Sequence, residues 1–493
     1  FFLLNTSGTL GGGTLNLRSD NGNIALTNRI DTSSNAGISG NIELFALNGD
    51  ISVSNSDIET DNTTGTAGDI TITAKTFTQS QGESSFDLSG EVQSGRLSIT
   101  VERFAMSGNV ELALTAESGG IPQDLTLTTD ELILENGARI SVDTVGTTQA
   151  PNFIADIGKL ALLSGAGGGI FFETESDGGA GRLTVTVPKA TVEEGAQISN
   201  IVRRGDRGGT LIDLPNSQFN LEDPGSELSF ENRGAGDADG ITIQVETGEV
   251  ILENGATISV SGTGSGSGGT LKILADSISL NEGARLTAAT FSGKGGDIDL
   301  HVRDSILLRF DSDIRADAKG TGEGGNIRMN AGGLILAFLP ENSDVIATGI
   351  EGRGGNIEAT AAGIFGFRLY QDVDTLESDF TASSQFGIDG TVTFNIRDSL
   401  QVEPLTEEFF DRELSEGCAA VGGDAEVKYF EIGRGGLPDG PHNFLGDNNA
   451  ADWVPFEVES EGELNGTPIE SQPDKHQSSS MLGDPICINV HLR

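Results

Sequence analysis

Cysteine, tryptophan, tyrosine and positive charge are scarce in this sequence. Among 493 residues there are 2 Cys, 1 Trp and 2 Tyr. Cys418 and Cys487 are too few for a disulfide framework, and they form either one bridge or two free thiols. Lys and Arg number 29 against 74 Asp and Glu, which gives a formal net charge of −45. An acidic field of this size repels phosphate backbones, which argues against nucleic acid as a partner.

A long apolar run is also missing. The most apolar stretch, residues 161–172, is rich in glycine and shorter than the about 20 residues that span a bilayer, which argues against membrane insertion. The chain opens with Phe1, Phe2, Leu3 and Leu4, without an initiator Met or a basic leader. We therefore expect a fragment that lacks its upstream targeting segment.

Glycine is abundant instead. The 70 glycines are about twice the usual share of about 7 %. They follow no Gly-X-Y period, which excludes collagen, and a hydrophobic content of 36 % is too high for a disordered chain. Because glycine is a poor helix former, helix bundles are excluded as well. A strand-rich architecture with many turns remains.

A cassette of two glycines, a polar residue and an alternating strand recurs along the chain. Four copies follow one another at residues 268–273, 295–300, 324–329 and 354–359. The second glycine of each pair, at 269, 296, 325 and 355, advances by 27, 29 and 30 residues. Weaker glycine anchors with a similar step extend the series from Gly13 to Gly390. Such a fixed step is the sequence signature of a solenoid.

A second cassette, Glu-Asn-Gly-Ala-x-Ile in its clearest copies, adds a turn and a further strand to each repeat. Asn136 and Asn254 occupy equivalent positions in it, and we assign them a structural role because Asn tolerates left-handed turn geometry. One repeat then holds three short strands with period-two alternation, for example residues 271–274, 277–280 and 285–288.

These repeats predict an all-β parallel β-helix of about 13 coils with three short strands per coil. At about 4.8 Å per coil the rod would be on the order of 60 Å long. A two-sheet sandwich array is the alternative, but it does not explain the fixed step. The 24 Phe are expected to stack mostly inside the coils.

The repeat region is predicted to cover residues 1–400. Residues 401–493 differ in composition: they hold 7 of the 13 Pro, both Cys and the single Trp453, and the cassettes stop. They are predicted to be a non-repetitive acidic extension with one edge strand near residues 456–463 and a flexible polar tail.

One acidic strand is a candidate for chemistry. Period two places Asp311, Asp313, Arg315 and Asp317 on one face, where paired carboxylates beside an arginine suit Ca²⁺ binding, uronate polarisation or glycosidic acid–base catalysis. A solvated strand face explains the same pattern, with Arg285 one coil away as an ion-pair partner. We favour that structural interpretation and predict no catalytic residue.

Other motifs give no cofactor or metal site. The glycine-rich residues 262–269 lack the Lys-Ser/Thr of a phosphate loop and are predicted to be a turn between strands. The tandem nonapeptide of calcium-bound β-rolls is absent from the sequence, so diffuse cation binding is the favoured alternative to specific calcium coils. The four histidines share no zinc-ligand spacing: His301, His442, His476 and His491.

With these motifs, the chain resembles the filamentous haemagglutinin-like exoproteins of two-partner secretion, and most closely their cyanobacterial branch. The resemblance is carried by the two cassettes, by Thr-Ala-Ser-Ser-Gln-Phe-Gly-Ile-Asp-Gly-Thr-Val at residues 381–392, and by Cys418 followed by Gly-Arg-Gly-Gly-Leu-Pro at residues 433–438. It covers about residues 10–455. The family's N-terminal secretion domain is missing, and the segment after Asp474 departs from the usual family ending.

The resemblance implies a secreted or cell-surface, right-handed β-helix that is exported through an outer-membrane partner transporter. It implies adhesion, aggregation or matrix contact, with a carbohydrate or cell-surface receptor or a second copy of the chain as partner. We therefore expect an adhesin-like protein without catalysis. The alternatives are a polysaccharide lyase or glycoside hydrolase that uses the acidic face, and a purely structural sheath component.

Overall fold

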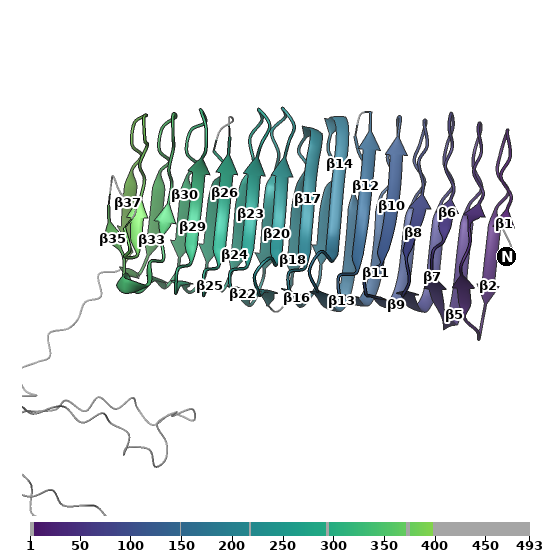
Figure 1. Ribbon diagram of the computed structural model, residues 1–493, viewed down its shortest axis with the longest axis horizontal. Coiled ribbons are helices and arrows are strands. Elements are labelled where there is room, and N and C mark those ends of the chain that lie inside the picture. Colours follow the sequence, from purple (N-terminus) through teal and green to yellow (C-terminus); the bar gives the residue numbers. More distant parts are fainter. Residues whose placement is uncertain (1–3, 148, 216–217, 292–294, 371–374, 398–493) are drawn as a thin grey trace, which may run out of the picture. The chain divides into compact units, whose positions relative to one another are not determined.

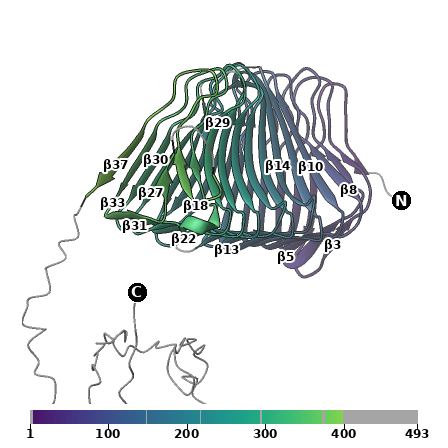
Figure 2. The same ribbon diagram turned by 60° about the vertical axis from the view of Figure 1, so that its left-hand side comes forward.

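The computed structural model describes residues 4–147, 149–215, 218–291, 295–370 and 375–397. These residues form a parallel β-helix of about 13 coils, and every strand pairing among them is parallel (Figures 1 and 2). The predicted fold class is therefore confirmed. The chain divides into two units, Phe1–Gln401 and Val402–Arg493. The predicted extension, with Cys418, Cys487 and Trp453, lies outside the described residues.

Sheet A holds 15 strands in the described part of the chain, one from each coil and the additional short strand β35 beside β36. In spatial order they are β1 (Leu4–Asn5), β4 (Ile30–Asp31), β6 (Asp57–Glu59), β8 (Glu83–Asp87), β10 (Glu111–Ser118), β12 (Arg139–Gly146), β14 (Gly169–Gly179), β17 (Gln197–Asp206), β20 (Glu227–Asn232), β23 (Thr257–Gly262), β26 (Arg285–Thr290), β29 (Asp313–Ala318), β32 (Val345–Ile346), β36 (Asp379–Thr381) and β35 (Arg368–Leu369).

The other strands form sheet B, which is bent into two arms. The first arm holds β2 (Leu15–Ser19), β15 (Arg182–Thr186), β18 (Gly209–Leu214), β21 (Gly240–Val245), β24 (Thr270–Ala275), β27 (Asp297–Val302), β30 (Ile327–Ala331), β33 (Ile357–Ala361) and β37 (Val392–Ile396). The second arm holds β3 (Ile24–Leu26), β16 (Ala190–Glu193), β19 (Phe219–Leu221), β22 (Glu249–Leu252), β25 (Ser277–Leu280), β28 (Ile306–Leu308), β31 (Leu334–Leu336) and β34 (Gly363–Phe365). Five strands run through both arms: β5 (Ile42–Val53), β7 (Ile70–Gln79), β9 (Leu97–Ser107), β11 (Leu125–Glu135) and β13 (Phe153–Ser164).

Three strands per coil, as predicted, are present from β15 onward. The first coil likewise has β2 and β3 as separate strands. In the five coils that contain β5, β7, β9, β11 and β13, the two arms are joined in one long strand, so the prediction of three short strands is wrong there. Register shifts mark the bend, for example between Thr129 and Glu131 in β11. A β-bulge turns a strand through a corner without ending it, which explains the difference.

The register between coils confirms the predicted step. Leu271 pairs with Ile298, Ile298 with Ile327, and Ile327 with Ile357. The turn at residues 262–269 lies between β23 and β24, as expected. The only helix among the described residues is the 3-10 turn η1 (Leu339–Glu341), and none is long and apolar enough to cross a membrane.

Inward side chains form one continuous apolar core, because alternate residues of every strand point into the coil. The prediction for phenylalanine holds in part. Phe77 and Phe104 stack inside the coils with ring centroids 4.8 Å apart. Phe310 and Phe338 instead lie at the surface beside Arg309, whose Cζ is 4.5 and 4.1 Å from their ring centroids. Arg309 is held there by Glu341, at 2.6 and 2.8 Å.

The second cassette forms a tight left-handed turn. Asn136 has φ +59° and Gly137 has φ +85°, and the N–H of Ala138 donates to Glu135 O at 3.2 Å. Two central residues with positive φ and this hydrogen bond are the features of a type I′ turn. Asn254 has the equivalent φ of +55°. The structural role assigned to both asparagines is consistent with this geometry.

The polar residue of the first cassette has a structural role that its sequence position does not reveal. Asn326 Oδ1 accepts the N–H of Asn356 at 3.2 Å, and Asn356 Oδ1 accepts the N–H of Thr391 at 3.2 Å. Asp297 likewise accepts the N–H of Asn326 at 2.8 Å. A side-chain ladder therefore links successive coils at the corner between the sheets.

We predict that Gly255→Ala lowers the free energy of unfolding by about 1–2 kcal/mol, because an L-residue is strained in the left-handed region. Gly255 has φ +79°, and an added Cβ would meet no atom within 4 Å, so only backbone strain acts. Denaturant titration measures the effect. Gly11→Ala is the matched control, since its Cβ would meet only Ile38 O at 3.6 Å without a left-handed φ. Equal effects of the two substitutions would contradict the assignment.

Candidate functional site

The acidic strand singled out in the sequence is β29 of sheet A. Asp313, Arg315 and Asp317 alternate along it, as predicted. Asp311 does not belong to this strand, because it lies in the preceding turn with φ +62°. The prediction that all four residues share one strand face is therefore wrong for Asp311, which a left-handed turn separates from the others.

Asp313 is nearly buried, with 6 % of its surface exposed. Its Oδ2 lies 3.5 Å from Arg285 Nε and 3.7 Å from Arg315 Nη1. Arg285 pairs with Asp313 in register on the neighbouring β26, as expected from the sequence. Burial raises the pKa of the Asp313 carboxyl above its ordinary value of 3.8, while Arg315, the N–H of Asp344 and Arg285 offset part of the rise.

Asp313 is the first of three stacked aspartates. The N–H of Asp344 donates to Asp313 Oδ1 at 3.3 Å, and the N–H of Asp379 donates to Asp344 Oδ1 at 2.8 Å. Asp344 and Asp379 are 2 % and 0 % exposed. A search for catalytic pairs overlooks this stack, although a recurring Ser-Asp pair marks it in the sequence. The three serines are fully buried: Ser312, Ser343 and Ser378.

The side chains around Asp313 line a shallow groove of about 370 Å³. Arg315 Nε lies 3.1 Å from Asp317 Oδ2, and the Thr348 hydroxyl donates to Asp317 Oδ1 at 2.7 Å. Both oxygens of Asp313 and of Asp317 therefore have partners within the protein. These contacts orient the two carboxylates and balance part of their charge within the protein.

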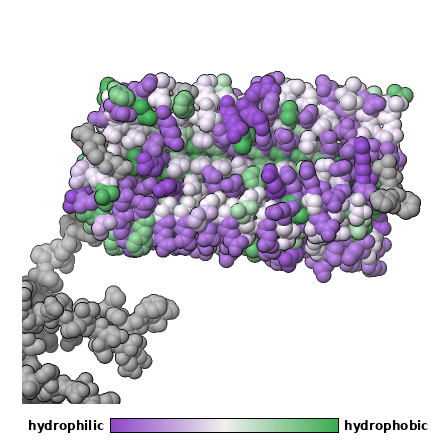
Figure 3. All heavy atoms as spheres, viewed as in Figure 1, coloured by the Kyte–Doolittle hydropathy of each residue, from purple (hydrophilic) through white to green (hydrophobic). Residues whose placement is uncertain are grey.

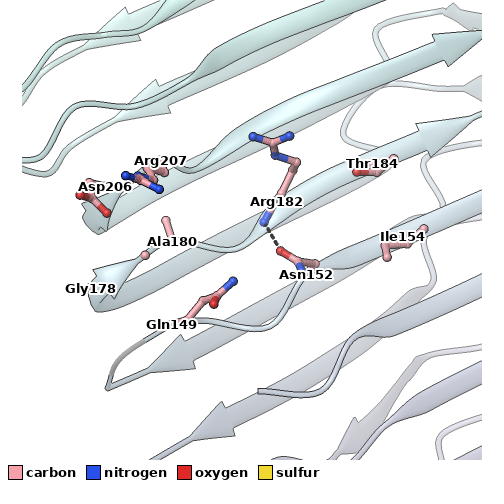
Figure 4. A pocket seen from close by; sticks show the side chains of 10 residues that line it. Gln149, Asn152, Ile154, Gly178, Ala180, Arg182, Thr184, Asp206 and Arg207 are labelled. Carbon is pink, nitrogen blue, oxygen red and sulfur yellow. Dashed lines mark hydrogen bonds between the residues drawn. The ribbon is translucent and has the colours of Figure 1, made fainter. Parts of the chain in front are cut away.

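A larger groove, of about 550 Å³, lies at the corner between sheet A and the first arm of sheet B (Figure 4). Its floor is made of small residues at the end of β14, Gly178 and Gly179, and of Ala180. Polar side chains from three successive coils surround this floor: Gln149, Asn152, Arg182, Thr184, Asp206 and Arg207. The groove therefore offers amide, hydroxyl, carboxylate and guanidinium groups within one concavity.

Glycine occupies the corner at this groove. β14 continues to Gly179 and β17 to Asp206, so only residues 180–181 and 207–208 separate them from β15 and β18. A Cβ on Gly181 would come within 2.1 Å of Pro151 O, so this corner has no room for a side chain at residue 181.

The charges of this groove differ from those of the chain as a whole. Arg182 is fixed through both its backbone and its side chain. Its backbone N–H donates to Asn152 Oδ1 at 2.9 Å, and its Nη2 lies 2.5 Å from Asp239 Oδ2. Arg207 is exposed, with φ +63°, and among the described residues no carboxylate lies within ion-pairing distance of its guanidinium. The groove is thus lined by two guanidinium groups and the Asp206 carboxylate, in a protein whose net charge is −45.

Sequence inspection did not single out this groove, although the dense Arg-Arg-Gly-Asp-Arg stretch at residues 203–207 is a visible signal. No group of three or more His, Cys, Asp or Glu that could hold a metal occurs in the described ranges. His301 Nδ1 lies 3.2 Å from Asp299 Oδ1 on β27, at the surface. The other histidines lie outside the described residues: His442, His476 and His491.

We predict that Asp313→Asn removes one pH dependence of stability. Between 3.8 and the raised pKa of the folded state, folded wild type holds a proton that the unfolded chain lacks, so its stability falls as pH rises through this window. The amide side chain of the variant cannot titrate, and the stability of wild type relative to the variant should decline with rising pH and then level off. Denaturant titrations of both proteins from about pH 3 to 7 measure this; a constant or rising difference contradicts it.

Comparisons with family models, with curated proteins and with solved structures find no match to this chain. The family resemblance therefore rests on the sequence motifs alone.

Proposed function

We propose that this chain is the β-helical shaft of a secreted or cell-surface adhesin-like exoprotein that makes adhesive, aggregative or matrix contacts through its outer strand faces. The supporting observation is that equivalent outward residues of successive coils lie one above the next, so that they form columns of polar side chains along the sheet. Thr71, Ser98 and Thr126 pair one above the next in sheet B. Figure 3 shows a mainly hydrophilic face with a short band of apolar residues along its middle. A regular polar surface suits a repetitive ligand such as a polysaccharide.

Export by two-partner secretion through an outer-membrane transporter, and membership of the cyanobacterial branch, belong to the same proposal and rest on the sequence motifs. The contacts of Asp313 and Asp317 favour a role without catalysis, because both carboxylates take part in contacts that link neighbouring coils, and Asp317 also pairs with Arg315 on the same strand. A receptor on another cell, a polysaccharide or a second copy of the chain are the partners that this proposal names.

We expect the purified chain to be retained on at least one member of a panel of immobilised polysaccharides or on cells, without release of new reducing or unsaturated ends. Retention and product formation are scored in parallel, with and without calcium. A protein of the same size and net charge without a β-helix controls for charge. Absence of retention on every surface would contradict the adhesive function and leave a purely structural rod.

A polysaccharide-degrading enzyme is the second candidate, because the groove beside Asp313 combines a carboxyl of raised pKa with two arginines. This candidate predicts product release by wild type and at least about a hundredfold loss in Asp313→Ala, the scale of one general acid–base group. Asp57→Ala, on the distant strand β6, is the control. Equal product release by wild type and Asp313→Ala, or none from either, eliminates this candidate.

A further inference from the structure

We propose that the groove between Gln149 and Arg207 binds an acidic oligosaccharide, with the carboxylate or sulfate group of one sugar lying against Arg182 and Arg207. This inference rests on the proposed adhesive function and gives it a ligand class and a site. Figure 4 shows Arg182 and Arg207 at the corners of neighbouring coils, both on the same side of Gln149 and Asn152. The volume of about 550 Å³ is within the range of about 300–1,000 Å³ typical of ligand pockets.

The positions of the arginines favour an anionic group. Asp239 pairs with Arg182, but the Arg182 side chain is 50 % exposed and remains accessible to a ligand. The backbone N–H of Arg207 donates to Asp237 O at 2.9 Å, and this hydrogen bond fixes the backbone that carries the Arg207 side chain. A guanidinium group binds a carboxylate or sulfate with two parallel hydrogen bonds, a geometry that a lysine cannot provide.

The remaining lining suits a sugar. The amide of Gln149 and the hydroxyl of Thr184 offer donors and acceptors for ring hydroxyls, and Asp206 offers an acceptor. Ile154 adds an apolar surface for a ring face. Nucleic acid and extended polyanions meet the repulsion of a −45 chain, so a short or locally docked acidic saccharide is favoured over them.

One glycine allows the groove to be filled without disturbing the coil. A Cβ on Gly179 would meet only Gln149 Cγ, at an ordinary 3.6 Å, and its φ lies outside the left-handed region. Gly179→Leu therefore places a side chain over the floor of the groove. Arg207→Gln removes the unpaired charge and keeps a polar side chain. Neither change touches the residues around Asp313.

Trigalacturonic acid is titrated into the whole purified chain at about 0.15 M salt and followed by calorimetry. We expect binding by wild type, at least tenfold weaker binding by both Gly179→Leu and Arg207→Gln, and no comparable binding of uncharged maltotriose. Gly11→Leu and Arg18→Gln, in the first coils, are the matched controls and should bind as wild type does. Denaturant titrations establish that all variants are folded.

A sulfated trisaccharide distinguishes the two anionic groups: binding that both groove variants weaken extends the site to sulfate, and its absence restricts the site to carboxylate. Unchanged binding in the groove variants, equal binding of maltotriose, or no binding by wild type at millimolar ligand overturns the proposal. Its failure is separable from that of the adhesive function. Retention on the panel without trigalacturonate binding refutes only the groove, and the reverse result refutes only the adhesive function.

Discussion

The whole structure depends on parallel hydrogen bonding between one coil and the next in fixed register. Each coil finds the partners for its backbone N–H and C=O groups in the coils before and after it, so neighbouring coils must match in length and in the position of their corners. The steps from Leu271 to Ile298, Ile327 and Ile357 follow from this requirement. The inward alternation and the left-handed turns at Asn136 and Asn254 recur because equivalent positions are used again from coil to coil.

Stacking also decides where charge is tolerated. Identical carboxylates in adjacent coils would lie about 4.8 Å apart and repel each other, so a strongly acidic solenoid must interleave them with other groups. Arg328 lies between Asp299 and Glu358, 4.0 and 3.6 Å from their carboxylates. Each exposed pair contributes at most about 1 kcal/mol, and its main effect is to relieve repulsion along a column. The aspartates at Asp313 and Asp344 are instead stabilised by N–H groups of the next coil.

The same constraint gives both grooves a rigid support. Arg285 and Asp313 pair in register on neighbouring strands, as Arg182 and Gly209 do beside the larger groove. The side chains that line each groove come from neighbouring coils, so the hydrogen bonds between coils hold them at fixed spacing.

The parallel β-helix, its step and the left-handed turn at Asn136 could be predicted from the sequence, because each depends on a residue pattern that recurs in every coil. Four other features were decided only by the tertiary structure: the joined strands before β15, the turn that separates Asp311 from Asp313, the aspartate stack and the groove at Arg207. Each of these depends on how one coil differs from its neighbours, and contacts between residues about 30 positions apart fix that difference. A recurring sequence pattern predicts the features that all coils share. The burial of particular side chains, their ion pairs and the shape of the surface depend instead on residues at which one coil departs from that pattern.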